Sequence, residues 1–258
     1  MKTIIAGQGE PVVLLHSSMS SKEQWLKLIQ LLEKNYQVIA IDLYGYGASE
    51  YPPDPASFSL LDEANRFLEI ITSLIGEQQF HLIGHSYGGA TALRFAYAEQ
   101  ERLLSLSVYE PVAFHLLAKS HPSYAPIKDI AERVDRELEQ DNASAATEQF
   151  VDFWSGSGTY AKLNGKRQGA FDRVIEKVSL DFQAIMNEPL SLEDYSSITL
   201  PLCVIAGKAS RAATQKIAQD LFATLPQTSF HWVEGGHMAP IARADLVNPI
   251  WERFLRSL

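Results

Sequence analysis

The sequence predicts an α/β protein with a mostly parallel sheet and helices on both of its faces. Short apolar runs rich in Val, Ile and Leu alternate with segments whose apolar residues recur at helical spacing, and this alternation is typical of the class. Several of the runs are apolar at consecutive positions, which indicates strands covered on both faces. No strand-like run occurs between about residues 112 and 197, so we expect a helical insertion there.

Strands are expected at the short apolar runs. The first two runs are separated by glycines and a proline at 7–11, and we interpret them as a hairpin. The expected strands are residues 3–6, 12–16, 37–41, 80–84, 104–109, 202–206 and 230–233.

Helices are expected where apolar residues return every three or four positions. The expected helices are residues 25–34, 60–75, a helix opening near 90, 126–142, 143–154, 171–186, 214–225 and 249–258. Glycines at 156–158 and 165 are interpreted as breaks between helices of the insertion. The predicted organisation is therefore a first core part (1–111), a helical cap (112–197) and a second core part (198–258).

Composition excludes several classes of partner. The 258 residues carry 22 Lys and Arg against 31 Asp and Glu, a net charge of −9, which would repel nucleic acid and anionic membranes. The single cysteine, Cys203, lies in an apolar run and is expected to be a buried thiol. Neither a signal peptide nor a run of membrane-spanning length is visible, so we expect a cytoplasmic protein that acts on a small molecule. The sequence leaves the oligomeric state open.

The most informative local pattern is GHSYGG at residues 84–89. It follows the apolar run at 80–83 and opens a helical pattern that includes Ala90, Leu93 and Tyr97. A strand, a sharp turn and a helix hold one hydroxyl at the end of a sheet. The glycines suit a turn with strained dihedral angles and close backbone neighbours. Ser86 is therefore the candidate nucleophile.

Polar side chains repeatedly follow the ends of expected strands. They are His16, Ser17, Ser18, Asp42, Ser86, Glu110, Ser210 and His237. Because ligands of open α/β sheets bind at the carboxyl ends of the strands, these positions indicate one shared crevice.

Four motifs resemble those of the α/β-hydrolase superfamily in order and spacing. They are LLHSS at 14–18, DLYGYGAS at 42–49, GHSYGG at 84–89 and GGHM at 235–238. The resemblance covers the whole chain and implies a mostly parallel α/β-hydrolase sheet with an inserted helical cap. It also implies acyl transfer through Ser86, with His237 as the base that takes the serine proton and later protonates the leaving group. No cofactor is implied, and the histidines lack the spacing of metal ligands.

An oxyanion hole is implied by the same resemblance, and its donors should be backbone N–H groups. One is expected on Tyr87, the residue after the nucleophile. The second is placed on Ser18, but the superfamily often has glycine where Ser17 stands, so the choice between Ser17 and Ser18 stays open. His16 and His85 are interpreted as structural histidines. Asp42 is expected to bind backbone amides of its turn.

The acid of the catalytic triad departs from the usual pattern. The superfamily usually carries it as G-x-x-D after the strand expected at 202–206, but here Ser210 holds the aspartate position. A serine cannot stabilise an imidazolium as a carboxylate does. Glu110, directly after the preceding strand, is the favoured acid, and its carboxylate is expected roughly 2.6–3.2 Å from a His237 ring nitrogen. The alternatives left open are no carboxylate at all, or Asp181, Asp194 or Asp245.

The cap contains many aromatic residues, some of which should face the crevice and give it an apolar lining. This favours an uncharged, apolar ester or related acyl compound as substrate. The size of Trp154 and Phe182 is expected to influence which acyl group is preferred. Cleavage of C–C, lactone or amide bonds remains an alternative, as does a non-catalytic ligand-binding protein of the same fold. Epoxide hydrolysis and dehalogenation in this fold would need a carboxylate at position 86.

Overall fold

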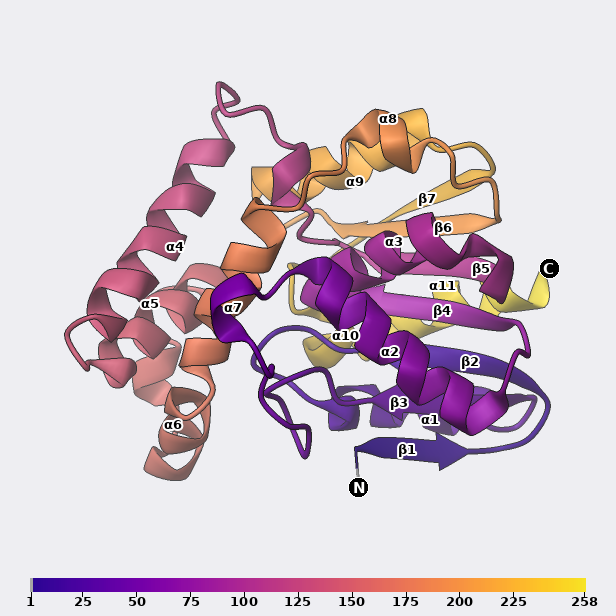
Figure 1. The fold of residues 1–258 in the computed structure, drawn as a ribbon, viewed down its shortest axis with the longest axis horizontal. Helices are drawn as coiled ribbons and strands as arrows, with labels where there is room; N and C mark the ends of the chain where they lie inside the picture. Colours follow the sequence, from indigo (N-terminus) through magenta and orange to yellow (C-terminus); the bar gives the residue numbers. More distant parts are fainter. Residues whose placement is uncertain (1) are drawn as a thin grey trace.

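The computed structural model describes residues 2–258, which form one seven-stranded sheet in the order β1-β3-β2-β4-β5-β6-β7 (Figure 1). The strands are β1 (Thr3–Ala6), β2 (Glu10–Leu15), β3 (Tyr36–Ile41), β4 (Phe80–His85), β5 (Leu103–Tyr109), β6 (Leu202–Gly207) and β7 (Thr228–Val233). All neighbours pair in parallel except β1, which is antiparallel to β3. The predicted fold class is confirmed.

The predicted hairpin of the first two strands is wrong. β3 lies between β1 and β2, because β2 pairs in parallel with both β3 and β4. The apolar run of β2 is buried from Pro11 onward, which requires a position inside the sheet. The connecting segment passes close to the start of β3: a Cβ on Gly7 would lie 2.2 Å from the Tyr36 carbonyl oxygen. The glycines between β1 and β2 thus allow the chain to pass over the start of β3, which a two-stranded hairpin would not require.

Helices cover both faces of the sheet. Their bounds are α1 (Leu26–Leu32), α2 (Leu60–Ile75), α3 (Tyr87–Glu99), α4 (Tyr124–Leu138), α5 (Ala143–Ser155), α6 (Gly165–Asp172), α7 (Ile175–Met186), α8 (Leu192–Tyr195), α9 (Ala212–Thr224), α10 (Ala239–Ala242) and α11 (Ala244–Arg256). On one face, Trp25, which directly precedes α1, and Trp251 of α11 pack against Val12 and Leu14. On the other, α2 and α3 pack Phe67 and Phe95 against the sheet. Alternate residues of β2 serve the two cores, as the strand period requires.

Helix α11 begins five residues before the predicted start at Pro249. Its first residue is Ala244, and Pro249 lies inside the helix. Tertiary packing explains the difference, since Ala244 and Val247 are buried in the same core as Trp251. Pro249 is the sixth residue of this helix and cannot donate a helical hydrogen bond, so the burial of Ala244 and Val247 outweighs that cost.

Residues 112–197, called the helical segment below, contain α4 to α8 and no strand. The predicted helix at 171–186 begins too early: its first two residues are the end of α6, and α7 covers 175–186. Gly165 opens α6 instead of separating helices. Asn164 caps α6 by accepting the Arg167 N–H, which explains the earlier start. The buried apolar residues of α7 begin at Ile175, after the end of α6. The division of the chain into two core parts and a cap stays a prediction.

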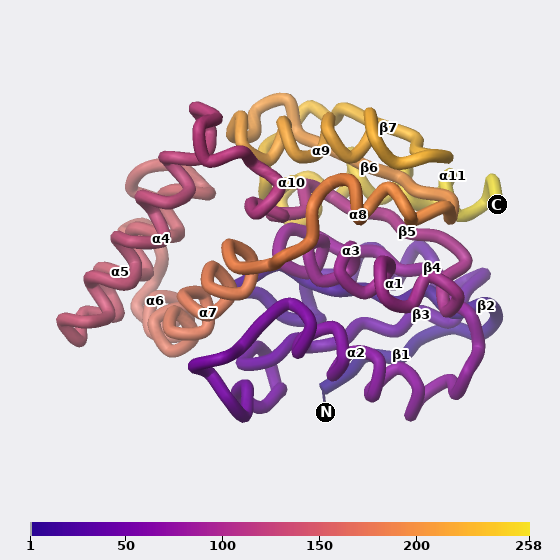
Figure 2. Tube along the Cα trace, turned by 45° about the horizontal axis from the view of Figure 1, so that its top comes forward, coloured from indigo at the N-terminus to yellow at the C-terminus, as the bar shows by residue number. Residues whose placement is uncertain are grey.

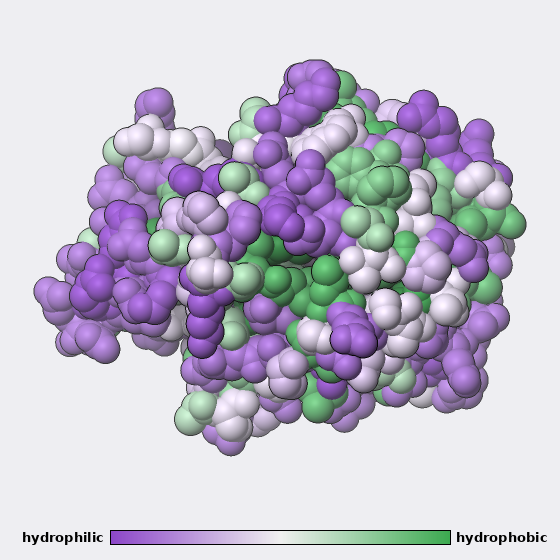
Figure 3. Space-filling model, turned by 90° about the horizontal axis from the view of Figure 1, so that it is seen from above, coloured by the Kyte–Doolittle hydropathy of each residue, from purple (hydrophilic) through white to green (hydrophobic). Residues whose placement is uncertain are grey.

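The helical segment faces the carboxyl ends of the parallel strands. Figures 1 and 2 show α4, α5 and α6 grouped beyond that end of the sheet, with α7 between them and the sheet. The side of this group seen in Figure 3 is mostly hydrophilic, whereas apolar residues show at the surface nearer the sheet. Within residues 2–258 no helix combines the length and the hydropathy that crossing a bilayer would need.

Candidate active site

Ser86 occupies the sharp turn between β4 and α3. Its backbone is in the left-handed half of conformational space (φ 57°, ψ −117°), which is strained for a residue with a side chain. Gly84 and Gly88 must be glycines because a side chain at either position would clash with the backbone. A Cβ on Gly84 would lie 2.4 Å from the Gly88 oxygen, and one on Gly88 would lie 2.4 Å from the Leu15 oxygen. The turn therefore packs against β2 and presents the Ser86 hydroxyl at the end of the sheet.

His237 lies beside this hydroxyl, in the loop between β7 and α10. Its Nε2 is 2.9 Å from Ser86 Oγ, and only 5% of the residue is exposed. The His237 carbonyl accepts a hydrogen bond of 2.9 Å from His85 Nε2. The histidine loop is thus fastened to the strand that carries the serine.

Glu110 follows β5 directly, and its carboxylate reaches the other side of the His237 ring. Oε2 lies 2.7 Å from His237 Nδ1, inside the distance range expected from the sequence. The carboxylate is fully buried and also accepts the Gly207 N–H (2.6 Å) and the Thr214 hydroxyl (3.0 Å). Its backbone φ of 41° is again strained for a residue that is not glycine. Three donors and a strained backbone hold this carboxylate in one orientation.

The other candidate acids lie elsewhere. Asp194 caps α8 through Ser191, Asp245 pairs with Arg243 at the surface, and Asp181 binds Lys177. Ser210, in the usual aspartate position, has a buried hydroxyl without a hydrogen-bond partner among residues 2–258.

Two backbone N–H groups are free to serve an oxyanion. The Ser17 N–H is occupied, because it donates 3.1 Å to Gln24 Oε1. Within the part of the chain that the structure describes, the N–H groups of Ser18 and Tyr87 have no acceptor. The geometry thus favours Ser18 over Ser17 as the partner of Tyr87.

His16, His85 and Asp42 have structural partners. His16 Nε2 accepts the Leu43 N–H and Nδ1 donates to the Ser17 carbonyl, while burial lowers the pKa of its imidazole to about 4. His85 is also fully buried, and burial together with the neighbouring His237 lowers its pKa well below the usual range. Asp42 accepts the N–H groups of Lys22 and Ala48, as expected for a turn-bracing carboxylate.

A buried charged cluster lies behind the candidate oxyanion hole. Asp181 on α7 pairs with Lys177 and accepts the hydroxyls of Ser18 and Tyr46. Desolvation raises the pKa of Asp181, and the Lys177 ammonium is the largest cause in the opposite direction. On the other side of Lys177, Glu63 accepts the Tyr87 hydroxyl at 3.0 Å.

Two cavities meet at Ser86. The larger measures about 710 Å³ and also contacts His237. Its walls are mostly apolar where α5, α6 and the histidine loop form them, and mostly polar along residues 17–24, which contribute four serines, Glu23 and Gln24. The smaller measures about 20 Å³ and is lined by residues of α7, by Phe114 and by Phe150 of α5. Trp154 lines both, and its ring lies over that of His237 with 4.3 Å between ring centroids.

A comparison with protein families identifies the family of this chain. The family model described as "Alpha/beta hydrolase family" matches residues 12–250. The chain belongs to this family. The match includes all four motifs that resemble the superfamily, from LLHSS to GGHM.

Curated relatives match this α/β hydrolase over part of their length. A fluoroacetate dehalogenase from Burkholderia sp. is 33% identical over 117 residues, 44% of this chain and 38% of that protein. A soluble epoxide hydrolase from Corynebacterium sp. (strain C12) is 34% identical over 112 residues, 43% of this chain and 38% of that protein. The matched part thus spans well under half of these relatives.

Solved structures match nearly the whole chain at lower identity. The enol-lactonase from Burkholderia xenovorans LB400 has a TM-score of 0.81 at 19% identity, covering 98% of this chain and 95% of that one. A thermophilic esterase from Thermogutta terrifontis has a TM-score of 0.78 at 22% identity, covering 99% and 92%. At these identities the likeness shows the shared fold.

Sequence reasoning missed several residues of this α/β-hydrolase site. Gln24 Nε2 contacts His85 Nδ1 at 3.1 Å while its oxygen accepts from Ser17, so it links the loop after β2 to the serine strand. Thr214 holds the Glu110 carboxylate, and Lys177 balances Asp181. None of them lies in a motif, and the one available signal was a lysine and an aspartate four residues apart in a predicted helix.

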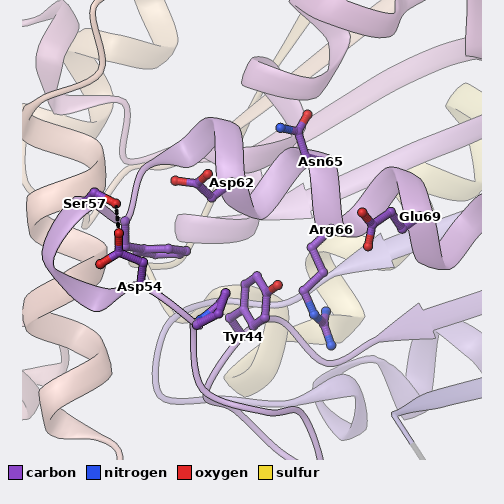
Figure 4. Close-up of a pocket in the computed structure, with 9 residues that line it drawn as sticks. Tyr44, Asp54, Ser57, Asp62, Asn65, Arg66 and Glu69 are labelled. Carbon is purple, nitrogen blue, oxygen red and sulfur yellow. Dashed lines mark hydrogen bonds between the residues drawn. The ribbon is translucent and has the colours of Figure 1, made fainter.

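A further surface pocket lies outside this site. It measures about 210 Å³ and lies against α2, where Arg66 extends toward the ring of Tyr44 and Ser57 donates to Asp54 (Figure 4). The described residues that line it include no histidine, so this pocket holds no serine–histidine pair. Within residues 2–258 no group of three or more His, Cys, Asp or Glu side chains is arranged to hold a metal ion.

Proposed function

We propose that this α/β hydrolase cleaves an apolar carboxylic ester through an acyl-enzyme on Ser86. The observation that carries the proposal is the unbroken line of hydrogen bonds from Ser86 Oγ through His237 to Glu110, at 2.9 and 2.7 Å, beside an apolar cavity. A serine hydroxyl is a poor nucleophile near neutral pH, and this line supplies the base and the group that orients it.

The reaction proceeds in two halves. Ser86 Oγ bonds to the carbonyl carbon as its proton passes to His237 Nε2, and the ester C–O bond then breaks as that proton passes to the leaving alkoxide. Water next loses a proton to His237 as it attacks the acyl carbon, and the proton returns to Ser86 as the carboxylic acid leaves. Glu110 holds the Nδ1–H tautomer and stabilises the imidazolium in both halves.

The oxyanion of each tetrahedral intermediate is bound by the N–H groups of Ser18 and Tyr87. Donors fixed in advance stabilise this charge without reorganisation, and one such donor contributes roughly 10²- to 10³-fold in rate. Gln24 keeps the Ser17 N–H turned away from this role by accepting it.

Ser86 argues against the chemistry named for two of the relatives. Displacement at an alkyl halide or an epoxide in this fold uses a carboxylate nucleophile, whereas position 86 offers a hydroxyl. Lactones, amides and C–C bonds next to a carbonyl remain within reach of the same acyl-enzyme chemistry. A non-catalytic binding protein would keep the fold without turnover.

The test combines a substrate panel with a serine-directed probe. Acyl esters of graded chain length are assayed with the wild type and with Ser86→Ala, and a fluorophosphonate is used to label the protein. We expect labelling at Ser86 and a loss on the order of 10⁴-fold or more in kcat for Ser86→Ala, with the fold intact by circular dichroism. Full activity in that variant would contradict the assignment, and an unlabelled, inactive wild type would favour the binding protein.

A further inference from the structure

The two cavities at Ser86 differ greatly in size. The larger has a volume of about 710 Å³ and the smaller about 20 Å³. Both include Ser86 and Ser18, so both open at the point where a carbonyl carbon would bind. The two substituents of that carbon must therefore enter spaces of unequal volume.

The walls of the small cavity are closely packed. Phe114 and Val178 are each 1% exposed, Ile185 is 2% exposed and Phe182 is 5% exposed. Protein cores of this density yield little to an added group without strain. The Asp181 carboxylate also borders this cavity, and its oxygens are engaged by Lys177, Ser18 and Tyr46. The wall is thus tight, and the carboxylate in it is already paired.

The position of His237 assigns the two substituents. His237 must deliver its proton to the leaving oxygen, so the leaving group lies on the imidazole side of the tetrahedral carbon. His237 borders the large cavity and is absent from the lining of the small one within residues 2–258. The alcohol part of an ester consequently enters the large cavity, and the acyl part enters the small one.

The volumes set the size of each part. A space of roughly 10–15 Å³ admits one water-sized group, so about 20 Å³ accommodates the methyl of an acetyl group and little more. The large cavity lies in the range of pockets that hold whole drug-sized molecules, roughly 300–1,000 Å³. Phe171, Val174, Leu163 and Met238 give it an apolar side, and the stretch 17–24 gives it a polar one.

We propose that the substrates of this enzyme are esters of a short acyl group, acetyl or close to it, with a bulky and mostly apolar alcohol. This inference rests on the proposed ester hydrolysis and adds its selectivity: acyl chain length is limited by α7 and Phe114, whereas the alcohol is accepted broadly.

The first test varies each part of the ester separately. The 2-naphthyl esters of acetic, butyric and octanoic acids vary the acyl group, and methyl octanoate reverses the two sizes. We expect kcat/KM to fall at least tenfold from acetate to butyrate and further for octanoate, with 2-naphthyl acetate far above methyl octanoate. Octanoate hydrolysed as well as acetate, or methyl octanoate preferred, would overturn the inference.

The second test enlarges one cavity at a time. Phe182→Ala should raise the butyrate-to-acetate ratio of kcat/KM about tenfold or more, and the milder Ile185→Val should shift it in the same direction if Phe182→Ala folds poorly. Phe171→Ala, in the large cavity, is the matched control and should leave that ratio unchanged whatever it does to absolute rates. An unchanged ratio in folded Phe182→Ala and Ile185→Val would overturn the inference.

The two proposals can fail separately. Fluorophosphonate labelling of Ser86 together with a preference for octanoate would remove the size assignment and leave ester hydrolysis standing. A wild type that is neither labelled nor active on any ester would remove both.

Discussion

The hydroxyl of Ser18 donates a hydrogen bond of 2.5 Å to the Asp181 carboxylate, although the two residues are 163 positions apart. Ser18 lies in the loop after β2, and Asp181 lies on α7 of the helical segment. The Tyr46 hydroxyl donates to the same carboxylate at 2.5 Å, and Lys177 pairs with it from one helical turn away. The helical segment is therefore joined by a buried polar contact to the loop that we assign to the oxyanion hole.

Asp181→Asn should lower both stability and kcat. The substitution leaves the buried Lys177 ammonium with Glu63 at 3.6 Å as its remaining carboxylate partner, and breaking a buried ion pair in this way costs about 3 kcal/mol or more. Thermal melting and ester kinetics measure the two effects. The double variant Asp181→Asn with Lys177→Met should recover part of the stability, because it removes the unpaired charge. A double variant less stable than the sum of the singles would contradict this account.

Glu110→Gln should lower kcat severalfold to several-thousandfold and change the melting temperature little. The amide keeps the shape of the carboxylate and can still accept the Gly207 N–H, but it cannot stabilise an imidazolium. Ser210→Ala is the control, since the Ser210 hydroxyl has no partner within residues 2–258. If Ser210→Ala lost more kcat than Glu110→Gln, the assignment of Glu110 as the acid would be wrong.

Trp154→Ala should lower kcat on a short acyl ester by roughly two- to thirtyfold, whereas Trp154→Phe should retain most of it. The indole lies over the His237 ring at 31° between planes, and an aromatic face stabilises a nearby cation by about 0.5–2 kcal/mol. Phe150→Ala serves as the control because Phe150 lines both cavities. If Phe150→Ala lost as much activity as Trp154→Ala, cavity shape rather than imidazolium stabilisation would be the cause.

The free energy of unfolding should decrease as the pH falls from about 6.5 to about 4. Burial lowers the pKa of His16 to about 4, and burial lowers that of His115 to about 4 as well. In this interval the unfolded chain binds protons at these histidines and the folded chain does not, so stability present above pH 6.5 is lost on acidification. For a fully buried His16 the loss is about 3 kcal/mol.

Urea unfolding at pH 7 and pH 4.5 measures this loss, and His115→Phe should make it smaller. Proton NMR of the imidazoles follows each histidine separately. A His16 resonance that titrates near pH 6.5 in the folded protein would contradict the assignment.

Much of the fold follows from local patterns. Continuous burial of β2 is visible as consecutive apolar residues. Helix α2 begins after Ser59, which forms a capping box with Asp62. The partner of β1 could not be found this way, because a strand of four residues fits several sheet edges, and the edge it takes is the one that β3 leaves free after pairing with β2. The start of α11 was hidden by Pro249, whose local preference was outweighed by burial of Ala244 and Val247.

The sequence by itself determined the features that depend on residues close together in the chain. Glycines around Ser86 are needed wherever that turn forms, and a histidine after paired glycines and a glutamate after an apolar strand are visible as residue types in order. The predicted contact of Glu110 with His237 rested on the superfamily resemblance, because Ser210 holds the usual aspartate position and Glu110 follows the preceding strand. The tertiary structure alone decided what depends on distances between remote segments. It turned the Ser17 N–H toward Gln24, placed Lys177 and Asp181 behind Ser18, and gave the two cavities unequal volumes. Those features arise from packing between helices and loops far apart in the chain, and side-chain packing of that kind has no signature in a single sequence.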